Sequence, residues 1–505
     1  MSVPDLHALL RRHWGYSKFR PKQESIVNAI LSGRDAAIVM PTGGGKSLCY
    51  QLPAVAMQRT CVVISPLIAL MQDQAANLRE MGIEAAFLNS ALEFSQVRET
   101  MQRAERGGYQ LLYLSPERIV REDTLRWLQR VPVGFFAIDE AHCISEWGHE
   151  FRPEYRQLSL LRERFPDIPI AAFTASATRV VRHDILAQLH LEHPACVVMS
   201  FHRPNLRYIV HECSEKGSTQ QQNMLLAAVE HYTEGNIIIY APTIKSVEAT
   251  TEWLVDQGVP AIAYHGRMDS AERARNQEAW MNGDPRVLVG TLAFGLGINK
   301  PDVRAVIHLS LPKSLEQYYQ EAGRAGRDGL PADCVLLWRK RDLGLLAHFI
   351  EQVQDDAERQ RAWQRYRVMR EFVEERECRH RSICLHFGET PSWQRCDACD
   401  VCGVSVDWTK AKPRPKKTVA PAKVTRAEMI EEQGSLGVAL REWRKELSKS
   451  TNVPAYVIIH DTTIAALCDH RPETLDELLK TPGIGERKAE KFGEQILALI
   501  ASHPE

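Results

Sequence analysis

The chain carries Met40-Pro-Thr-Gly-Gly-Gly-Lys-Ser47 at the end of the apolar run Ala36-Ala-Ile-Val-Met40. Such a run is typical of a buried strand, and the segment after Ser47 has a helical pattern. A glycine-rich turn between a strand and a helix lets backbone N–H groups surround phosphate, while Lys46 reaches the β- and γ-phosphates and Ser47 holds Mg²⁺. Met40 stands where the strict pattern has glycine, but Gly45, Lys46 and Ser47 are intact. We therefore predict a nucleotide-binding P-loop.

A second apolar run, Phe135-Phe-Ala-Ile138, ends in Asp139-Glu-Ala-His142. A carboxylate at a strand end, downstream of a P-loop, is what Mg²⁺–nucleotide chemistry requires. The two motifs together predict a nucleoside triphosphatase.

Bulk properties exclude some classes of protein. The 505 residues are 44% hydrophobic and 25% charged, with a formal net charge of −1, so a nucleic-acid partner must be held by local patches. The N-terminus lacks a basic stretch followed by an apolar run, and no apolar stretch approaches membrane-spanning length. Most of the 12 cysteines are scattered, which suits buried thiols in a reducing compartment. We expect a cytoplasmic protein, associated with the nucleoid if bacterial, and no membrane partner.

Short apolar runs alternate with helical patterns up to about residue 340, which predicts parallel sheets covered by helices on both faces. Besides the two runs quoted above, these are Cys61–Ile64, Leu111–Leu114, Ile170–Phe173, Ile237–Tyr240, Ala261–Tyr264, Val287–Val289, Val306–Leu309 and Cys334–Leu337. We expect two tandem α/β domains facing a shared cleft, then a small helical module with a cysteine cluster and an all-α domain. The expected boundaries are 1–200, 201–340, 341–408 for the helical module, 409–433 for a basic linker and 434–505 for the terminal helices. The linker is expected to be disordered because it is rich in Lys, Arg and Pro.

The second α/β block contains Gln320-Glu-Ala-Gly-Arg-Ala-Gly-Arg-Asp-Gly329. Arg324 and Arg327, three residues apart, can present two guanidinium groups on one side. In a two-domain triphosphatase, their best use is to reach across the cleft to the γ-phosphate.

Cys396-Asp-Ala-Cys399-Asp-Val-Cys402 repeats a Cys-x-x-Cys spacing. This spacing fits a closed, structural Zn²⁺ site better than a redox pair. Cys378, Cys384, His380 and His386 compete for the fourth ligand position.

Taken together, these motifs make the chain resemble a RecQ-type superfamily-two DNA helicase, from Leu9 to Cys402 and again from about residue 434 to 505. The matching segments occur in the family's order and spacing. They are Gly15-Tyr-Ser-Lys-Phe-Arg-Pro-Lys-Gln23, Pro41–Ser47, Asp139–His142, Ile144-Ser-Glu-Trp-Gly-His-Glu-Phe-Arg-Pro153, Phe173-Thr-Ala-Ser-Ala-Thr178, Phe201-His-Arg-Pro-Asn205, Thr291-Leu-Ala-Phe-Gly-Leu-Gly-Ile-Asn-Lys-Pro301 and Gln320–Gly329.

The resemblance implies that the two tandem α/β domains are RecA-like parallel-sheet domains, and it implies roles for residues at matching positions. The implied ATP-binding residues are Tyr16, Arg20, Gln23, Thr42, Gly43, Gly44, Gly45, Lys46 and Ser47. Tyr16 and Arg20 would sandwich the adenine and Gln23 would read its edge, which favours ATP over GTP. Asp139 would bind Mg²⁺, Glu140 would polarise the attacking water, and Arg327 with Arg324 would stabilise the transition state. Gln320 and Thr174 would couple the nucleotide to domain movement, and Cys378 would complete the zinc site.

The segment after Asp139–His142 gathers aromatic and basic groups that can stack on bases or grip phosphate. The residues proposed for DNA sensing and coupling are His142, Trp147, His149, Phe151, Arg152 and Thr174. The alternative is a buried aromatic cluster beneath the sheet. Trp147-Gly-His149 favours an exposed loop, and the resemblance implies that this loop is the family's aromatic-rich DNA sensor.

Only about thirty residues separate Cys402 from the terminal helices, so the winged-helix domain of many family members is expected to be absent. The terminal segment resembles the family's HRDC domain. Its Gly483-Ile-Gly485 turn can offer N–H groups to a phosphate or can be a plain packing turn between helices. The tail is also a candidate for binding DNA-repair proteins.

The sequence therefore predicts an ATP-dependent helicase that moves 3′→5′ on single-stranded DNA and acts in DNA recombination and repair, with single-stranded and partly duplex DNA as its partners. The expected cofactors are ATP, Mg²⁺ and one structural Zn²⁺. Two alternatives remain: a DNA-stimulated translocase or annealing factor with weak unwinding, and a non-enzymatic DNA-binding scaffold. Both the movement along single-stranded DNA and its polarity follow from the resemblance alone.

Overall fold

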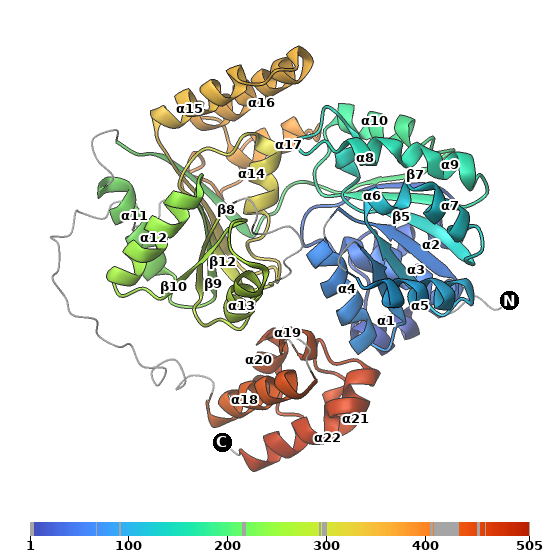
Figure 1. Ribbon diagram of the computed structural model, residues 1–505. Coiled ribbons are helices and arrows are strands. Elements are labelled where there is room, and N and C mark those ends of the chain that lie inside the picture. The colour runs from blue at the N-terminus through green and yellow to red at the C-terminus, as the bar shows by residue number, and fades with distance from the viewer. Residues whose placement is uncertain are drawn as a thin grey trace.

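The computed structural model describes residues 5–66, 68–89, 92–214, 219–291, 294, 300–404, 408, 434–451, 455–459 and 461–503. Within these residues lie two α/β domains side by side, a helical module that touches both of them, and a separate C-terminal helical domain (Figure 1). No described helix combines the length and the apolar character needed to cross a membrane.

The first domain is built on a parallel sheet which, in the described residues, has seven strands in the order β3-β4-β2-β5-β6-β1-β7. Its strands are β1 (Ala36–Val39), β2 (Thr60–Ile64), β3 (Ala85–Leu88), β4 (Leu111–Leu114), β5 (Val133–Ile138), β6 (Ile170–Thr174) and β7 (Ala195–Val198). Its helices are α1 (Leu6–Trp14), α2 (Gln23–Leu31), α3 (Lys46–Met57), α4 (Ile68–Glu80), α5 (Phe94–Glu105), α6 (Pro116–Ile119), α7 (Glu122–Leu128), α8 (Pro153–Arg156), α9 (Leu160–Arg164) and α10 (Arg179–Gln188), with 3₁₀ turns η1 (Ala141–Ile144) and η2 (Gln157–Ser159).

The second domain repeats this plan. Its parallel sheet, counted over the described segments, has six strands in the order β10-β11-β9-β12-β13-β8. The strands are β8 (Leu206–Glu212), β9 (Asn236–Tyr240), β10 (Ala261–Tyr264), β11 (Val287–Gly290), β12 (Val303–His308) and β13 (Ala332–Trp338). The helices are α11 (Thr219–His231), α12 (Ile244–Asp256), α13 (Ser270–Met281) and α14 (Leu315–Ala322).

The strand order of the first sheet decides where its motifs meet. Strand β6 lies between β5 and β1, and in a parallel sheet the carboxyl ends of all strands share one edge. The P-loop after β1 and Asp139 after β5 therefore flank Thr174 at the end of β6. The apolar runs that predicted these strands are buried: every residue of β5 and of β6 is inaccessible to solvent or nearly so.

Helices α15 (Lys340–Glu351), α16 (Asp356–Glu374) and α17 (Arg379–His386) form the helical module. In Figure 1, α15 and α16 make a hairpin above the second domain, and α17 lies toward the first. One continuous apolar cluster includes Phe201, Tyr208, Phe372 and Phe387. The module thus shares its core with the segment that joins the two sheets.

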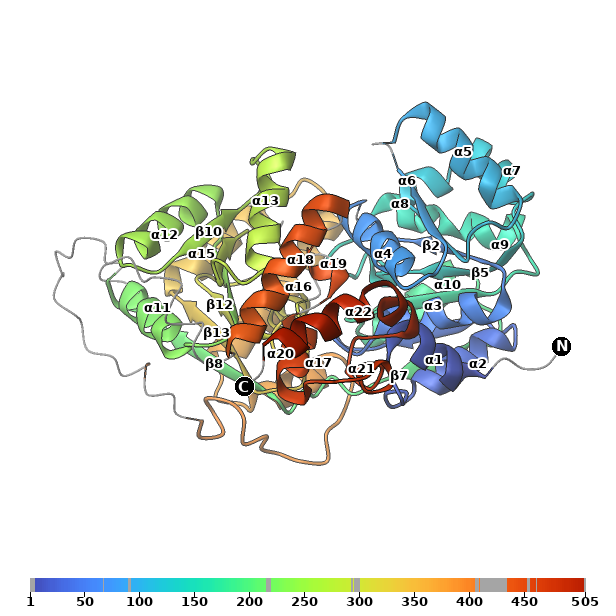
Figure 2. The same cartoon turned by 90° about the horizontal axis from the view of Figure 1, so that it is seen from below.

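The C-terminal domain comprises α18 (Gly434–Thr451), α19 (Ala455–Ile458), α20 (Asp461–His470), α21 (Leu475–Leu478) and α22 (Glu486–Ser502). It has its own apolar core, which includes Leu436, Leu440, Phe492 and Ile496. In Figure 1 it lies below the two α/β domains, near the centre, and Figure 2 shows it from below. Its helix α22 contacts α1, and its helix α19 contacts α4.

The predicted fold class is confirmed: two parallel α/β domains precede a helical cysteine-bearing module and an all-α domain. Strands β3, β7 and β8 were not predicted. Strand β7 is an edge strand whose residues alternate between partly buried and exposed positions, so it lacks a continuous apolar run. The expected basic linker, 409–433, lies outside the described residues.

Candidate active site

The P-loop lies where the sequence placed it, between β1 and α3. Met40 N–H donates a hydrogen bond to Thr174 O at 3.0 Å, which continues the pairing of β1 with β6. Gly43 and Gly45 have φ of 81° and 85°, values that favour glycine. Helix α3 begins at Lys46, so its N–H groups face the loop.

Met40, the residue that departs from the strict P-loop pattern, packs closely against Gly44 of the loop. A Cβ built on Gly44 would lie 2.5 Å from Cγ of the buried Met40. The methionine side chain thus fills space that a glycine at 44 leaves free. The loop accommodates Met40 without change to Lys46 or Ser47.

The N-terminal motif contacts the P-loop directly. Gln23 is buried; its Oε1 accepts from Arg20 N–H at 2.9 Å, and its Nε2 lies 3.3 Å from both Gly44 O and Gly45 O. The Arg20 guanidinium donates to Gly43 O, and Tyr16 is about half exposed, at 48%. Gln23 therefore organises the loop here, and its role in reading an adenine edge stays a prediction.

Asp139 and Glu140 follow β5 as adjacent carboxylates, of which Asp139 is buried and Glu140 is partly buried. Burial and the neighbouring Glu140 raise the pKa of Asp139 to about 7. Burial also works against ionisation of Glu140, but the neighbouring His142 and the charge of Lys46 prevail and lower the pKa of Glu140 to about 2. His142 Nδ1 lies 3.3 Å from Glu140 Oε2. The pair offers one firmly ionised carboxylate beside one that a cation would ionise.

Residues of the second domain pack against the P-loop, at the carboxyl edge of the first sheet. A Cβ built on Gly323 would lie 3.3 Å from Cβ of Thr42, and one on Gly43 would lie 3.2 Å from Cγ of Arg327. Burial, Arg324 and Arg203 together lower the pKa of Arg327, and Glu140 opposes that change. Crowded guanidinium groups against a P-loop favour an anion between them.

The predicted sensor loop is exposed at its aromatic side chains. Trp147 and Phe151 are 50% and 37% exposed, which agrees with the exposed loop expected from the sequence. Arg152 NH1 lies 3.5 Å from Pro66 O. His149 is partly buried and stacks on His142, with ring centroids 4.7 Å apart, so it connects the loop to the acidic pair.

One further contact at this loop was not predicted. Arg361 of α16 lies over the Trp147 ring, with Cζ 5.9 Å from the centroid, and pairs with Glu146 at 3.5 Å. Both contacts cross more than 200 positions of sequence, so no local pattern indicated them.

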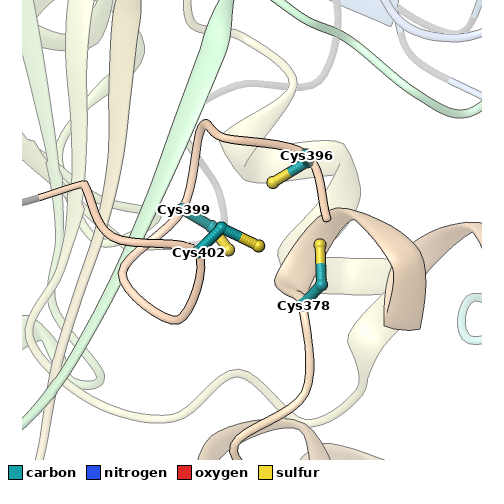
Figure 3. Close-up of side chains that lie close together, drawn as sticks. All are labelled: Cys378, Cys396, Cys399 and Cys402. Atoms are coloured by element: carbon teal, nitrogen blue, oxygen red, sulfur yellow. The ribbon is translucent and has the colours of Figure 1, made fainter. Parts of the chain in front are cut away.

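The sulfur atoms of Cys378, Cys396, Cys399 and Cys402 lie within 4.8 Å of one another (Figure 3). Four converging thiols are the donor set of a tetrahedral structural Zn²⁺ site, so these residues fit the ion. The competitors are engaged elsewhere: His380 Nε2 lies 2.9 Å from Leu206 O, and His386 Nε2 lies 2.7 Å from Glu316 Oε1. Cys384 is buried apart from the four, and burial raises its pKa to about 12.

The Gly483-Ile-Gly485 turn packs against α1. A Cβ built on Gly485 would lie 2.7 Å from Arg12 O, and one on Gly15 would lie 2.9 Å from Ile484 O. Lys491 Nζ lies 2.9 Å from Glu80 Oε2 on α4. The turn thus packs between the two domains, and its binding of phosphate stays a prediction.

Comparison with known proteins agrees with this geometry. Four family models match: DEAD/DEAH box helicase at residues 20–183, helicase conserved C-terminal domain at 220–329, RecQ zinc-binding at 340–403 and HRDC domain at 433–500. The ATP-dependent DNA helicase RecQ of Haemophilus influenzae is 33% identical over 99% of this chain and 96% of its own. The protein of the same name from Bacillus subtilis is 33% identical over 98% of each chain.

Solved structures show the same fold at low identity. The Mycobacterium smegmatis helicase Lhr, bound to single-stranded DNA and AMP-PNP, matches with a TM-score of 0.53 and 18% identity over 71% of this chain and 56% of its own.

The alignment with the Haemophilus protein spans 604 positions, whereas this chain has 505 residues. That relative therefore has a stretch without a counterpart here. The span between the zinc-binding and HRDC matches, from 403 to 433, is too short for a winged-helix domain.

Proposed function

Because this chain belongs to the RecQ family of ATP-dependent DNA helicases, we propose that it uses the site between its two α/β domains to drive 3′→5′ movement on single-stranded DNA and to separate duplex strands. The observation that carries the proposal is the packing of Arg327 and Gly323, from the second domain, on Gly43 and Thr42 of the P-loop. A triphosphate held by the P-loop would lie within reach of groups from both domains. Its hydrolysis would then change the contact between them.

Each residue of the site has its own part in ATP hydrolysis. Lys46 and the α3 N-terminus hold the β- and γ-phosphates. Asp139 and Ser47 would hold Mg²⁺, which would offset charge on the phosphate oxygens. Glu140, kept ionised by His142, orients and polarises the attacking water. Arg324 and Arg327 stabilise the charge that develops on the transferred phosphoryl group.

DNA is sensed through the loop that carries Trp147. Its exposed ring is available for stacking, and its neighbours His149 and His142 lead back to Glu140. We propose that base stacking on Trp147 shifts this histidine pair and so changes the position of Glu140. Phe151 and Arg152 would add stacking and phosphate contacts.

A DNA-stimulated translocase that unwinds poorly is the second candidate, because the chain between residues 403 and 433 cannot hold a winged helix. The experiment that separates the two measures ATPase activity and unwinding of a tailed duplex together. Strand separation in proportion to ATP hydrolysis supports the helicase; hydrolysis with translocation but without separation supports the translocase. We further propose that the protein acts in recombination and repair at chromosomal DNA in the cytoplasm, with repair proteins as partners of its C-terminal domain.

A further inference from the structure

The segment that joins the two sheets also holds the arginines of the proposed active site. Strand β7 ends at Val198 and β8 begins at Leu206. Between them, the Arg203 guanidinium donates hydrogen bonds to three backbone carbonyls: Gly323 O at 2.7 Å, Ala325 O at 2.9 Å and Gly326 O at 2.7 Å. These carbonyls belong to the same short segment as Arg324 and Arg327, residues 323–327, which we call the arginine segment.

A second side chain of this linker reinforces the contact. Asn205 Nδ2 donates to Gly326 O at 2.9 Å and to Leu330 O at 3.0 Å. Gly326 has φ of 54°, and a Cβ at this position would lie 2.6 Å from Asn205 Nδ2. Linker and arginine segment therefore fit closely.

The arginine segment depends on such anchors because it follows the end of α14 at Ala322. Carbonyls at the C-terminal end of a helix lack partners within the helix, and a loop without regular structure is fixed only by its contacts. Hydrogen bonds from a charged guanidinium are among the strongest available. Arg203 thus fixes the backbone on which both active-site arginines are mounted.

The linker is itself held by the zinc-binding module. Glu389 accepts hydrogen bonds from Ser200 Oγ at 2.6 Å and from Phe201 N–H at 2.7 Å. The rings of Phe201 and Phe387 are stacked, with centroids 4.5 Å apart. The module therefore connects through this linker to the arginine segment.

We propose that Arg203 is a positioning residue for ATP hydrolysis: it sets the place of Arg324 and Arg327 against the P-loop without touching the nucleotide. This inference rests on the transition-state role proposed for those two arginines. It assigns to the linker a part in the chemistry as well as in joining the domains.

The test compares Arg203→Lys with a matched control, Arg207→Lys. Lysine keeps the positive charge but cannot bond three carbonyls through a planar fork. Arg207 lies four residues away on β8 and bonds Asp333 through two guanidinium nitrogens, at 2.5 and 2.9 Å, so its replacement is a comparable change away from the arginine segment. Asn205→Ala, which removes the second anchor, serves as an independent variant.

For Arg203→Lys we expect the DNA-stimulated kcat to fall about ten-fold or more, because a small displacement of a catalytic group can cost a factor of about 100. The KM for ATP and the melting temperature should stay close to those of Arg207→Lys. Affinity for ADP with aluminium fluoride, a transition-state mimic, should fall relative to affinity for AMP-PNP. A variant that had merely lost stability would lower both affinities equally.

Arg327→Ala is measured in parallel to separate two kinds of failure. One outcome is that Arg327→Ala loses the preference for the transition-state mimic, whereas Arg203→Lys keeps both this preference and the wild-type kcat. The inference about Arg203 is then overturned, while the role proposed for Arg327 stands. If Arg327→Ala also keeps this preference and kcat, the transition-state role of the arginines is wrong and the inference falls with it.

Discussion

Gln320 of the second domain donates a hydrogen bond from Nε2 to Ser176 Oγ of the first domain at 2.7 Å. Ser176 follows Thr174, whose hydroxyl lies 2.9 Å from His142 Nδ1. A short chain of polar contacts thus runs from the second domain, through the end of β6, to the histidine beside Glu140. Both residues proposed for coupling, Gln320 and Thr174, take part in it.

Glu140→Gln should abolish DNA-stimulated ATP hydrolysis and leave DNA binding largely intact. The amide cannot carry the negative charge that polarises water, and loss of a general base typically costs about 10²–10⁴-fold. Phosphate release is measured with saturating single-stranded DNA. The control is Glu163→Gln, an exposed glutamate on α9. Hydrolysis by Glu140→Gln within a few-fold of wild type would refute the assignment.

Trp147→Ala should keep basal ATPase activity and lose most of its stimulation by single-stranded DNA. The exposed ring supplies stacking worth about 1–3 kcal/mol per base. Because the ring belongs neither to the P-loop nor to the acidic pair, basal hydrolysis should not depend on it. Phe94→Ala is the matched control, because Phe94 is an aromatic side chain of the same domain that is 82% exposed. Equal loss of basal and stimulated rates would show that the loop is structural.

Cys399→Ser should yield zinc-free or insoluble protein, since formation of a four-thiolate site is coupled to folding. Cys384→Ser provides the control: this thiol is buried on α17 but is not among the four converging sulfurs. Metal content is measured on purified protein by elemental analysis. We expect one zinc per chain in wild type and in Cys384→Ser. Well-folded wild-type protein without zinc would overturn the site.

Gly485→Ala should loosen the C-terminal domain from α1, because the added Cβ would lie 2.7 Å from the backbone oxygen of Arg12. Gly485 has φ of −94°, so alanine is not strained within the domain itself. Gly344→Ala, where nothing lies within 4 Å of the added atom, is the control. We expect a larger maximum dimension in small-angle scattering for Gly485→Ala alone. Identical scattering for both variants would mean that the domain does not depend on this contact.

The sequence predicted those parts of the site whose chemistry is local. The P-loop, the Asp139–Glu140 pair and the cysteine spacing each lie within a few residues, so pattern and chemistry coincide. The contacts of Arg203 with residues 323–326 join positions 120 to 123 apart. The motif Phe201–Asn205 was visible in the sequence, but its hydrogen-bond partners were not.

The sequence likewise did not predict how the domains pack against each other. The Gly483–Gly485 turn fits phosphate binding and helix packing equally well as a pattern, and its close approach to Arg12 is visible only in the structure. The amide of Gln23 shows the same limit, because its bonds to Gly44 and Gly45 depend on how α2 lies against the P-loop.

The most direct test of the central claim is ATP-dependent unwinding of tailed duplexes by the full chain, with Glu140→Gln as the inactive reference. The account predicts that the wild-type protein separates a duplex with a 3′ single-stranded tail and leaves one with a 5′ tail intact, in proportion to ATP hydrolysed. Vigorous DNA-stimulated hydrolysis without strand separation from either substrate would contradict it.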